Sequence, residues 1–389
     1  MIYFDHNATT PMVPAAREAW LRAADEFWHN PSAPYRAAGR ARNRLEDCRE
    51  RLAGLLGCPV GELIFNSGAT EANNAVMAHY GRGAEGRQGV LLAPVEHPCV
   101  REAARAAFGE RVSWLGVDSE GRVDPAEVEQ RIRDERPALV SVMAANNETG
   151  VVQPFREIAE RCRAFRVPFH CDAAQWFGKY PAAALSGCDL VSGSAHKFGG
   201  SKGTGFLRVS ARFSGFQGQR GGGHEHRRRA GTEDLPGVAA MVAALEACEA
   251  DGSVDIEERA SRRDAFESAV REAVPGARAV STGADRLWNT SMLVMPRHAN
   301  HRWVLKLDRD GFAVSTGSAC ATADRAPSHV LAALGISPDE AKRAVRVSAG
   351  GATGSEDWRG LAEVFGGIWE RWDESDSGQS LTNVISVEP

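Results

Sequence analysis

The chain has 389 residues, a net charge of −5 at pH 7, 43% hydrophobic residues and 25% charged residues. This composition is ordinary for a globular protein, and it argues against a broad basic surface for nucleic acids or anionic lipids. No apolar run is long enough to span a membrane, and the first residues lack a secretory signal pattern. We therefore expect no membrane contact and no direct binding of nucleic acid.

The cysteines indicate the compartment. Eight of them are scattered along the chain, and none forms a Cys-x-x-Cys pair. In a chain of this length, such spacing favours reduced thiols over a disulfide framework or a zinc site. We expect a cytoplasmic protein without a bound metal ion.

The first two thirds of the chain alternate between helix and strand patterns. A helix is predicted over 34–56, ending at Gly57, then a strand at 62–65 and a helix from the turn at 66–73 to about 80. Further strands are expected near 90–93, 112–116, 138–143, 167–171, 189–192 and 204–209, with helices near 98–108, 125–134 and 155–165. The strands are continuous apolar runs, as expected when both faces of a sheet are covered. The pattern predicts an α/β fold with a doubly wound, mostly parallel sheet.

The pattern changes after a helix near 236–249. Helices are predicted at 255–273, 301–309 and 355–371, and strands at 290–294, 312–315 and 344–348. We expect two domains: a large α/β domain over 16–254, and a smaller α+β domain made of 1–15 and 255–389. The polar tail from about residue 374 is expected to be flexible.

The stretch Asp189–Phe206 carries the first candidate for chemistry. A short apolar strand leads into small residues, then His196 and Lys197, then a glycine-rich turn and a second strand. A lysine that is desolvated among small neighbours has a lowered pKa, and its neutral amine can attack a carbonyl group. Pyridoxal phosphate (PLP) is a cofactor that uses such an amine. The alternative is a surface lysine in a flexible loop.

The stretch Ser67–Glu71 joins a predicted strand to a predicted helix. The start of a helix offers free N–H groups and the positive end of the dipole, so this turn is suited to hold a phosphate group. Gly68 would allow close approach, and the hydroxyl of Thr70 would add a donor. An ordinary helix cap is the alternative.

Asp172 follows a buried strand, where ligands of open α/β sheets bind. Its carboxylate could pair with a protonated pyridine nitrogen, and the amide of Gln175 could donate to the ring oxygen. A helix-capping aspartate is the alternative. Asn147 and His97 follow two other buried strands, and each could contact a cofactor or substrate or be structural.

Three stretches nearer the C-terminus add candidates. The glycine-rich, basic loop 221–232 could contact a phosphate across a subunit boundary or be a solvated charge run. Cys320, in a loop of small residues, could be a nucleophile or a packed thiol. Arg346 ends a strand, and its guanidinium could grip a carboxylate in two-point fashion or form a structural ion pair.

Taken together, these stretches resemble the PLP-dependent cysteine desulfurases of the NifS/IscS type, within the class V aminotransferase family. Nine stretches match in family order between residue 1 and about residue 350. They are Asp5–Pro11, Ser67–Glu71, Glu96–His97, Asn146–Glu148, Asp172–Gln175, Ser194–Lys197, Arg229–Thr232, Ser315–Cys320 and Arg346–Ser348. The resemblance implies the type I fold of PLP-dependent transferases.

The resemblance also implies roles for single residues. Lys197 would form the Schiff base with PLP, Asp172 and Gln175 would serve the ring, and His97 would stack on it. Asn147 would contact cofactor and substrate, Arg346 would bind the substrate, and Cys320 would take the sulfur. The phosphate would be held by a set of small, hydroxyl and imidazole residues from both subunits, namely Ala69, Thr70, Ser194, His196 and Thr232 of the partner subunit.

The implied function is conversion of L-cysteine to L-alanine in a homodimer, with the sulfur passed as a persulfide to an acceptor protein, for example in iron–sulfur cluster assembly. Alternatives are a selenocysteine lyase or an aminotransferase on the same scaffold, and a catalytically silent sulfur-relay or assembly partner. The chain departs from the family pattern at Gly351, where an arginine is usual, at Ala195, where glycine is usual, and in its basic run Arg227–Arg229.

Overall fold

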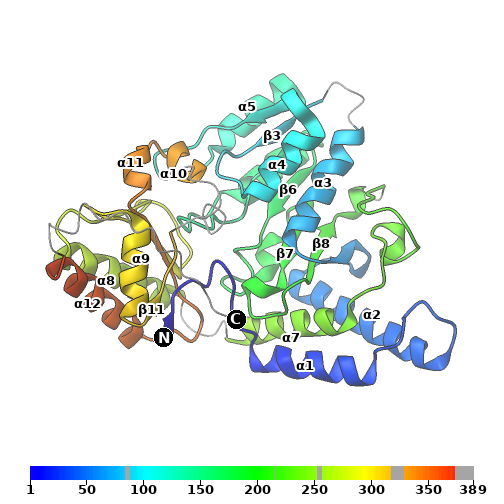
Figure 1. The fold of residues 1–389 in the computed structure, drawn as a ribbon. Helices are drawn as coiled ribbons and strands as arrows, with labels where there is room; N and C mark the ends of the chain where they lie inside the picture. The colour runs from blue at the N-terminus through cyan, green and yellow to red at the C-terminus, as the bar shows by residue number, and fades with distance from the viewer. Residues whose placement is uncertain (84–87, 214, 252–255, 317–327, 373–389) are drawn as a thin grey trace.

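The computed structural model describes residues 1–83, 88–213, 215–251, 256–316 and 328–372. Its larger part is built on a seven-stranded sheet with the order β2-β8-β7-β6-β5-β3-β4 (Figure 1). The strands are β2 (Leu63–Asn66), β3 (Val90–Leu92), β4 (Val112–Trp114), β5 (Leu139–Ser141), β6 (Phe169–Asp172), β7 (Leu190–Ser194) and β8 (Gly205–Val209). Only β8 runs antiparallel to its neighbours, so the predicted mostly parallel sheet is confirmed.

The apolar character of the strands follows from burial on both faces. In β3, Leu91 belongs to the hydrophobic cluster on one face of the sheet, while Val90 and Leu92 belong to the cluster on the other. Successive side chains of a strand point to opposite faces, so both faces demand apolar residues. This is the physical reason why the predicted strands lack alternation.

Helices cover the two faces of the large sheet. α3 and α4 pack on one face, and α2, α5, α6 and α7 pack on the other (Figure 1). The helices of this part are α1 (Pro14–Glu26), α2 (Arg36–Leu56), α3 (Ala69–Gly83), α4 (Pro98–Phe108), α5 (Pro125–Glu135), α6 (Phe155–Ala164) and α7 (Leu235–Asp251). α2 ends at Gly57, whose φ of 62° is the left-handed conformation that favours glycine.

Helix α1 was not predicted from the sequence. It packs along α7 on the outside of the larger part (Figure 1). Its buried residues are two alanines, Ala16 and Ala23, so it carries no stripe of large apolar side chains. A helix is recognised in a sequence by such a periodic stripe of apolar residues, and α1 has none.

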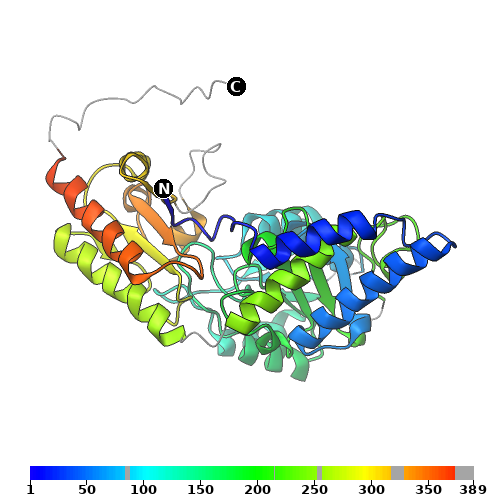
Figure 2. The ribbon, with the colours of Figure 1, turned by 90° about the horizontal axis from the view of Figure 1, so that it is seen from below.

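The smaller part has its own core around a three-stranded antiparallel sheet with the order β12-β10-β9, flanked by α8 and α12 (Figure 2). Its elements are α8 (Ile256–Ala273), β9 (Arg278–Ala279), β10 (Thr290–Val294), α9 (Asn300–Arg309), β11 (Phe312–Ala313), α10 (His329–Ala333), α11 (Pro338–Ala341), β12 (Ala344–Ser348) and α12 (Ser355–Glu370). β1 (Ile2–Tyr3) pairs in parallel with β11, and Phe4 belongs to this core. The pairing supports our proposal that 1–15 join 255–389 in the smaller domain.

The segment that follows β1 links the two parts, and we call residues 5–13 the strap. The strap runs between the smaller part and α1 (Figure 2). At one end, the His6 N–H donates to the Ser348 carbonyl at 3.0 Å. At the other end, the N–H groups of Thr10 and Val13 donate to the carbonyls of His196 and Gly199 at 2.8 and 2.9 Å. The strap is thus tied to β12 and to the loop that holds Lys197.

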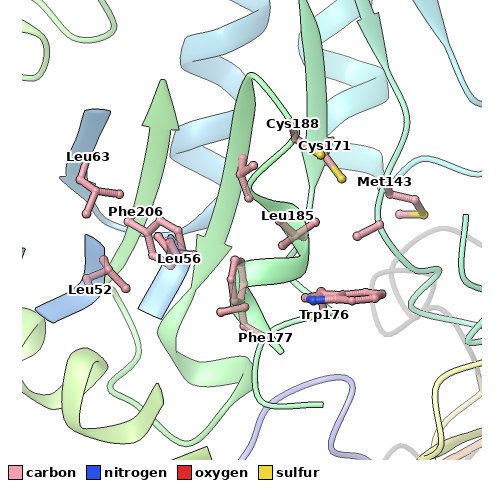
Figure 3. Close-up of a cluster of buried hydrophobic side chains, with 14 of the residues drawn as sticks. Leu52, Leu56, Leu63, Met143, Cys171, Trp176, Phe177, Leu185, Cys188 and Phe206 are labelled. Atoms are coloured by element: carbon pink, nitrogen blue, oxygen red, sulfur yellow. The ribbon is translucent and has the colours of Figure 1, made fainter. Parts of the chain in front are cut away.

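The core of the larger part contains several of the thiols. Cys171 and Cys188 lie together among Leu185, Trp176 and Phe177 (Figure 3). Burial raises the pKa of Cys171 well above its ordinary value. The structure contains no disulfide among the seven cysteines that it describes. No described helix combines the length and the apolar character that a membrane crossing requires.

The basic run Arg227–Arg229 lies in a loop with unusual backbone geometry. Glu225, His226 and Arg227 all have positive φ values, of 47°, 55° and 66°. The buried carboxylate of Glu225 holds this turn, because it accepts two hydrogen bonds from Arg49 at 2.7 and 2.8 Å. Left-handed residues other than glycine cost roughly 1–2 kcal/mol each, so the buried ion pair maintains a strained turn.

This strain gives a prediction for stability. Arg227 is exposed, and Arg227→Gly should raise the free energy of unfolding by roughly 0.5–1 kcal/mol, because glycine adopts positive φ without steric cost. The measurement is denaturant unfolding of the full chain. Arg220→Gly is the control, since it removes the same charge from an exposed residue without positive φ. If both variants lose stability equally, the turn is not strained at Arg227.

Candidate active site

Lys197 lies in the turn between β7 and β8, at the carboxyl end of β7. Its amine is partly buried and donates hydrogen bonds to two backbone carbonyls of the strap, those of Asn7 at 2.6 Å and Ala8 at 2.8 Å. Because β7 is buried on both faces and the strap covers the turn, the lysine has a fixed direction. The strap therefore holds the Lys197 amine in place, whereas the amine of a surface lysine in a flexible loop would move freely in solvent.

The predicted phosphate end lies at the start of α3. Gly68 has a φ of 136°, and a Cβ placed on it would come within 3.1 Å of the Ser194 hydroxyl. The N-terminus of α3 and the end of β7 therefore meet here, with Ala69 buried and Thr70 exposed. His196 follows Ser194 by two residues, and its Nδ1 lies 3.1 Å from the Thr9 hydroxyl. Burial and the charge of Lys197 lower the pKa of His196 to about 4.

Asp172 ends β6 and is nearly fully buried, with 5% of its surface exposed. Oδ2 accepts a hydrogen bond from Nδ2 of Asn73 on α3 at 2.7 Å, and Oδ1 accepts from the N–H of Ala174 at 3.0 Å. The second contact is local, but the residues that follow Asp172 form a turn and not the helix that the helix-capping alternative requires. The first contact joins two elements, and the sequence analysis did not single out Asn73.

His97 caps the N-terminus of α4. Nδ1 accepts from the N–H of Cys99 at 3.2 Å and lies 3.0 Å from the Cys99 thiol. Burial lowers the pKa of the imidazole, so the ring is neutral at pH 7 and carries its proton on Nε2. Burial, together with the negative charge of Asp172, raises the pKa of the Cys99 thiol to about 12. Asn73 also contacts this thiol, at 3.2 Å.

Glu96 is a second carboxyl group in this region. It is fully buried, and Oε1 accepts from the N–H of Met143 at 2.6 Å. Burial and the negative charge of Asp172 raise its pKa well above the ordinary value, so the site favours the neutral form of Glu96. Asp172 then supplies the negative charge among these buried groups.

Gln175 lies in the turn after β6 and is buried. Nε2 donates to the Asn7 carbonyl at 2.9 Å, the same oxygen that accepts from Lys197. Oε1 accepts from Nζ of Lys179 at 3.0 Å. The strap therefore brings the predicted residues Lys197 and Gln175 together. Neither Asn7 nor Lys179 was assigned a role from the sequence, although the motif containing Asn7 was noted.

Arg346 is buried on β12 and reaches the strap. Its Nη2 donates to Oδ1 of Asp5 at 2.6 Å, and Nη1 donates to the Asn147 carbonyl at 3.0 Å. The ion-pair alternative for Arg346 is thus present in the structure. The same contacts place Arg346 beside Asn147, and the expected roles of both residues toward the substrate stay predictions.

Two predicted residues are not placed with the others. Thr232 is exposed, and its expected role concerns the partner subunit, so it stays a prediction. Cys320 lies outside the residues that the structure describes. The remaining predicted residues lie in the first turn of α3, at the last residues of β6 and β7, on the segments that follow β3, β5, β6 and β7, or on β12.

Comparison with known proteins agrees with this arrangement. The model of the family described as aminotransferase class-V matches residues 2–359. The chain belongs to this family. A cysteine desulfurase IscS from Dictyoglomus turgidum is 32% identical over 375 residues, covering 95% of each chain. Members of the family generally depend on PLP.

Solved structures show the same relationship. A NifS-like protein superposes with a TM-score of 0.86 at 28% identity, over 95% of this chain and 99% of that one. A protein described as SspA in complex with cysteine superposes with a TM-score of 0.78 at 30% identity, over 90% and 98%. The expected fold of PLP-dependent transferases is thereby confirmed.

The imidazole of His170, two residues before Asp172, gives a pH prediction. It is fully buried between the hydroxyls of Ser141 and Ser192, at 2.8 and 3.0 Å, and burial lowers its pKa to about 4. In the unfolded state this histidine has a pKa near 6.5 and binds a proton as the pH falls below that value, whereas the folded state binds it only at a much lower pH. The free energy of unfolding therefore decreases as the pH drops below about 6.5. In His170→Gln, the loss of unfolding free energy between pH 7 and pH 5 should be smaller than in the wild-type protein by about 2 kcal/mol.

The measurement is denaturant unfolding of both proteins at the two pH values. Other histidines with a lowered pKa, such as the half-buried His6 and His196, contribute equally to both proteins and cancel in the difference. An identical loss of stability in wild type and variant would show that His170 accepts a proton in the folded state.

Proposed function

We propose that this chain is a PLP-dependent cysteine desulfurase that converts L-cysteine to L-alanine and receives the sulfur on Cys320 as a persulfide. One observation carries the proposal. In a chain whose relatives are named cysteine desulfurases, the amine of Lys197 is held by backbone carbonyls at the carboxyl ends of parallel strands, beside Gln175. That edge of the sheet is where α/β proteins bind cofactors.

The residues present fit PLP. Gly68 leaves a cradle that a side chain would fill, next to the Ser194 hydroxyl and the start of α3, and this arrangement suits a phosphate group. The buried Asp172 carboxylate suits a protonated ring nitrogen, and the Lys197 amine suits an aldehyde. The phosphate would further involve Ala69, Thr70, His196 and Thr232 of the partner subunit. When bound, PLP would supply an electron sink for charge on the substrate's carbon.

Two side chains are suited to move protons. Lys197 can release or accept a proton at Nζ, where the carbonyls of Asn7 and Ala8 now hold it. His97 is neutral with its proton on Nε2, since Nδ1 faces Cys99. We propose that the neutral, flat face of this ring stacks on the cofactor and that its Nε2–H serves as a donor.

The substrate's carboxylate would be bound by Arg346, with Asn147 beside it. In the structure Arg346 is paired with Asp5 at 2.6 Å, which holds the guanidinium in place before any ligand arrives. A charge-assisted contact of this kind contributes roughly 1.5–3 kcal/mol. We propose that the substrate's carboxylate binds to the guanidinium of Arg346 while Asp5 stays paired with it. Asp5 would then orient the guanidinium, and its N–H groups would donate to both carboxylates.

The sulfur transfer balances without a further reactant. The Cys320 thiolate attacks the sulfur of L-cysteine and forms a sulfur–sulfur bond, while the carbon–sulfur bond breaks and its electron pair stays with the carbon. Protonation of that carbon gives L-alanine. The products are one L-alanine and one persulfide, which an acceptor protein then takes up. We propose that the protein acts as a homodimer in the cytoplasm and serves an acceptor such as a scaffold for iron–sulfur cluster assembly.

The lysine assignment gives one prediction. Lys197→Ala should remove the visible absorption band of the PLP-loaded protein and abolish alanine formation from L-cysteine, because no other described amine is held at this edge of the sheet by the strap carbonyls. Absorption spectra and alanine analysis measure the two effects. Lys342→Met, at the exposed residue that caps the C-terminus of α11, is the control and should keep both. A Lys197→Ala protein that still turns over cysteine would exclude this role.

The cysteine assignment gives another. Cys320→Ala should keep the visible band but lose persulfide and alanine formation, since the thiolate is the sulfur's first acceptor. The experiment is incubation with L-cysteine, followed by mass analysis of the residue 320 peptide in the wild-type protein and alanine analysis in both. Cys58→Ala is the control for loss of a thiol. Alanine release at the wild-type rate from Cys320→Ala would mean that another group takes the sulfur.

A further inference from the structure

Lys179 is a buried lysine that the proposed reaction does not use. It lies in the turn after β6 with 8% of its surface exposed. Nζ donates to Oε1 of Gln175 at 3.0 Å, and its carbonyl accepts from Nε1 of Trp288 at 3.0 Å. Among the ion pairs found in the described part of the chain, none involves Lys179. A buried amine without a carboxylate partner is costly, so its position calls for a function.

The hydrogen bond from Lys179 settles the orientation of the Gln175 amide. A protonated lysine amine is a donor only and the Asn7 carbonyl is an acceptor only, whereas an amide has one accepting end and one donating end. Lys179 therefore fixes Oε1 toward itself and turns Nε2 toward the Asn7 carbonyl, at 2.9 Å. The same carbonyl accepts from the Lys197 amine at 2.6 Å. A continuous relay thus joins Lys179 to Lys197 through Gln175 and Asn7.

The two lysines also share a cavity. It has a volume of about 560 Å³ and lies between the two parts of the molecule, with Lys179, Lys197 and Trp288 in its wall. Burial, reinforced by the positive charge of Lys197, lowers the pKa of Lys179 to about 7. The other titratable groups that act on Lys179 are Cys248 and Arg346, and His6 in turn feels its charge. Charge on one lysine therefore disfavours charge on the other.

We propose that Lys179 is a positioning residue for this site, whose amine fixes the Gln175 amide and thereby the hydrogen bonds around the Lys197 amine. This inference rests on the proposed function, in which Gln175 donates to the ring oxygen of PLP. Gln175 has two N–H groups, one engaged by Asn7 and one left for the ring. A donor at Oε1 polarises the amide and strengthens both of these bonds.

The sign of the effect follows from the charges. A cation near Lys197 disfavours the protonated form of its nitrogen, so Lys179 should lower the pKa of that nitrogen, as a neighbouring cation does for other nucleophilic lysines. Loss of Lys179 should raise this pKa. The same direction holds for the amine of the cofactor-free protein and for the nitrogen joined to PLP.

The test is a pH titration of the visible absorption of the PLP-loaded full chain. In Lys179→Met the midpoint should rise by about one pH unit relative to wild type, while Lys179→Arg, which keeps a donor and a charge, should bring it back toward wild type. Lys342→Met controls for loss of a distant lysine and should leave the midpoint unchanged. A folded, loaded Lys179→Met protein with the wild-type midpoint would overturn the proposal.

A second measurement separates this inference from the proposed function. Competitive acetylation of Lys197 in the cofactor-free full chain, followed by mass spectrometry across pH 6–10, reports the pKa of its amine without PLP. At pH 6–7, where Lys179 still carries its charge, Lys179→Met should slow the acetylation of Lys197, because the lost cation no longer disfavours the protonated amine; an unchanged rate would contradict the proposal. A wild-type protein without any visible band would instead contradict the proposed function. If Lys179→Met does not fold, Lys179→Arg and Lys179→Gln replace it, and equal midpoints in these two would overturn the role of the charge.

Discussion

The carbonyl oxygen of Asn7 is the point on which the site depends. It accepts hydrogen bonds from Lys197 at 2.6 Å and from Gln175 at 2.9 Å. The side chain of Asn7 is itself fixed, since Nδ2 donates to the Thr290 hydroxyl at 2.9 Å on β10 of the smaller part. The strap thus connects the position of the smaller part to the position of Lys197 in the larger part. Displacement of the strap would release the lysine and the amide together.

Electrostatics around Asp172 follow from burial. Glu96, His97, Cys99 and His170 are all titratable, and burial shifts the pKa of each toward its neutral form. The fully charged form of such a cluster would be very costly in a medium that screens poorly. Keeping the neighbours neutral leaves Asp172 as the anion that faces Asn73 and the Ala174 N–H. The region is therefore prepared to receive a positive charge, such as a protonated ring nitrogen.

The sequence predicted the sheet and its turns well, because both depend on local patterns. Buried parallel strands are short apolar runs, and the residues after them, such as Asp172 and Lys197, lie at one edge of the sheet by topology alone. The contacts of Asn73, Cys99 and Lys179 were not predicted, because they depend on which helix or turn packs against which strand end. Helix α1 escaped because its buried face consists of alanines. The roles of Cys320 and of Thr232 of the partner subunit stay predictions.

The glycine-rich loop shows how a departure from the family pattern can be accommodated. The basic run suggested either a phosphate contact or a solvated charge run. In the structure, Arg229 pairs with Glu71 at the start of α3 at 2.9 Å, and Glu225 is buried on Arg49. That buried pair holds the left-handed turn 225–227. The Glu225 carboxylate also accepts a hydrogen bond from the N–H of Phe65 on β2 at 2.8 Å. Because β2 leads directly to Gly68, the strain in this loop is balanced by contacts that also set the position of the predicted phosphate end.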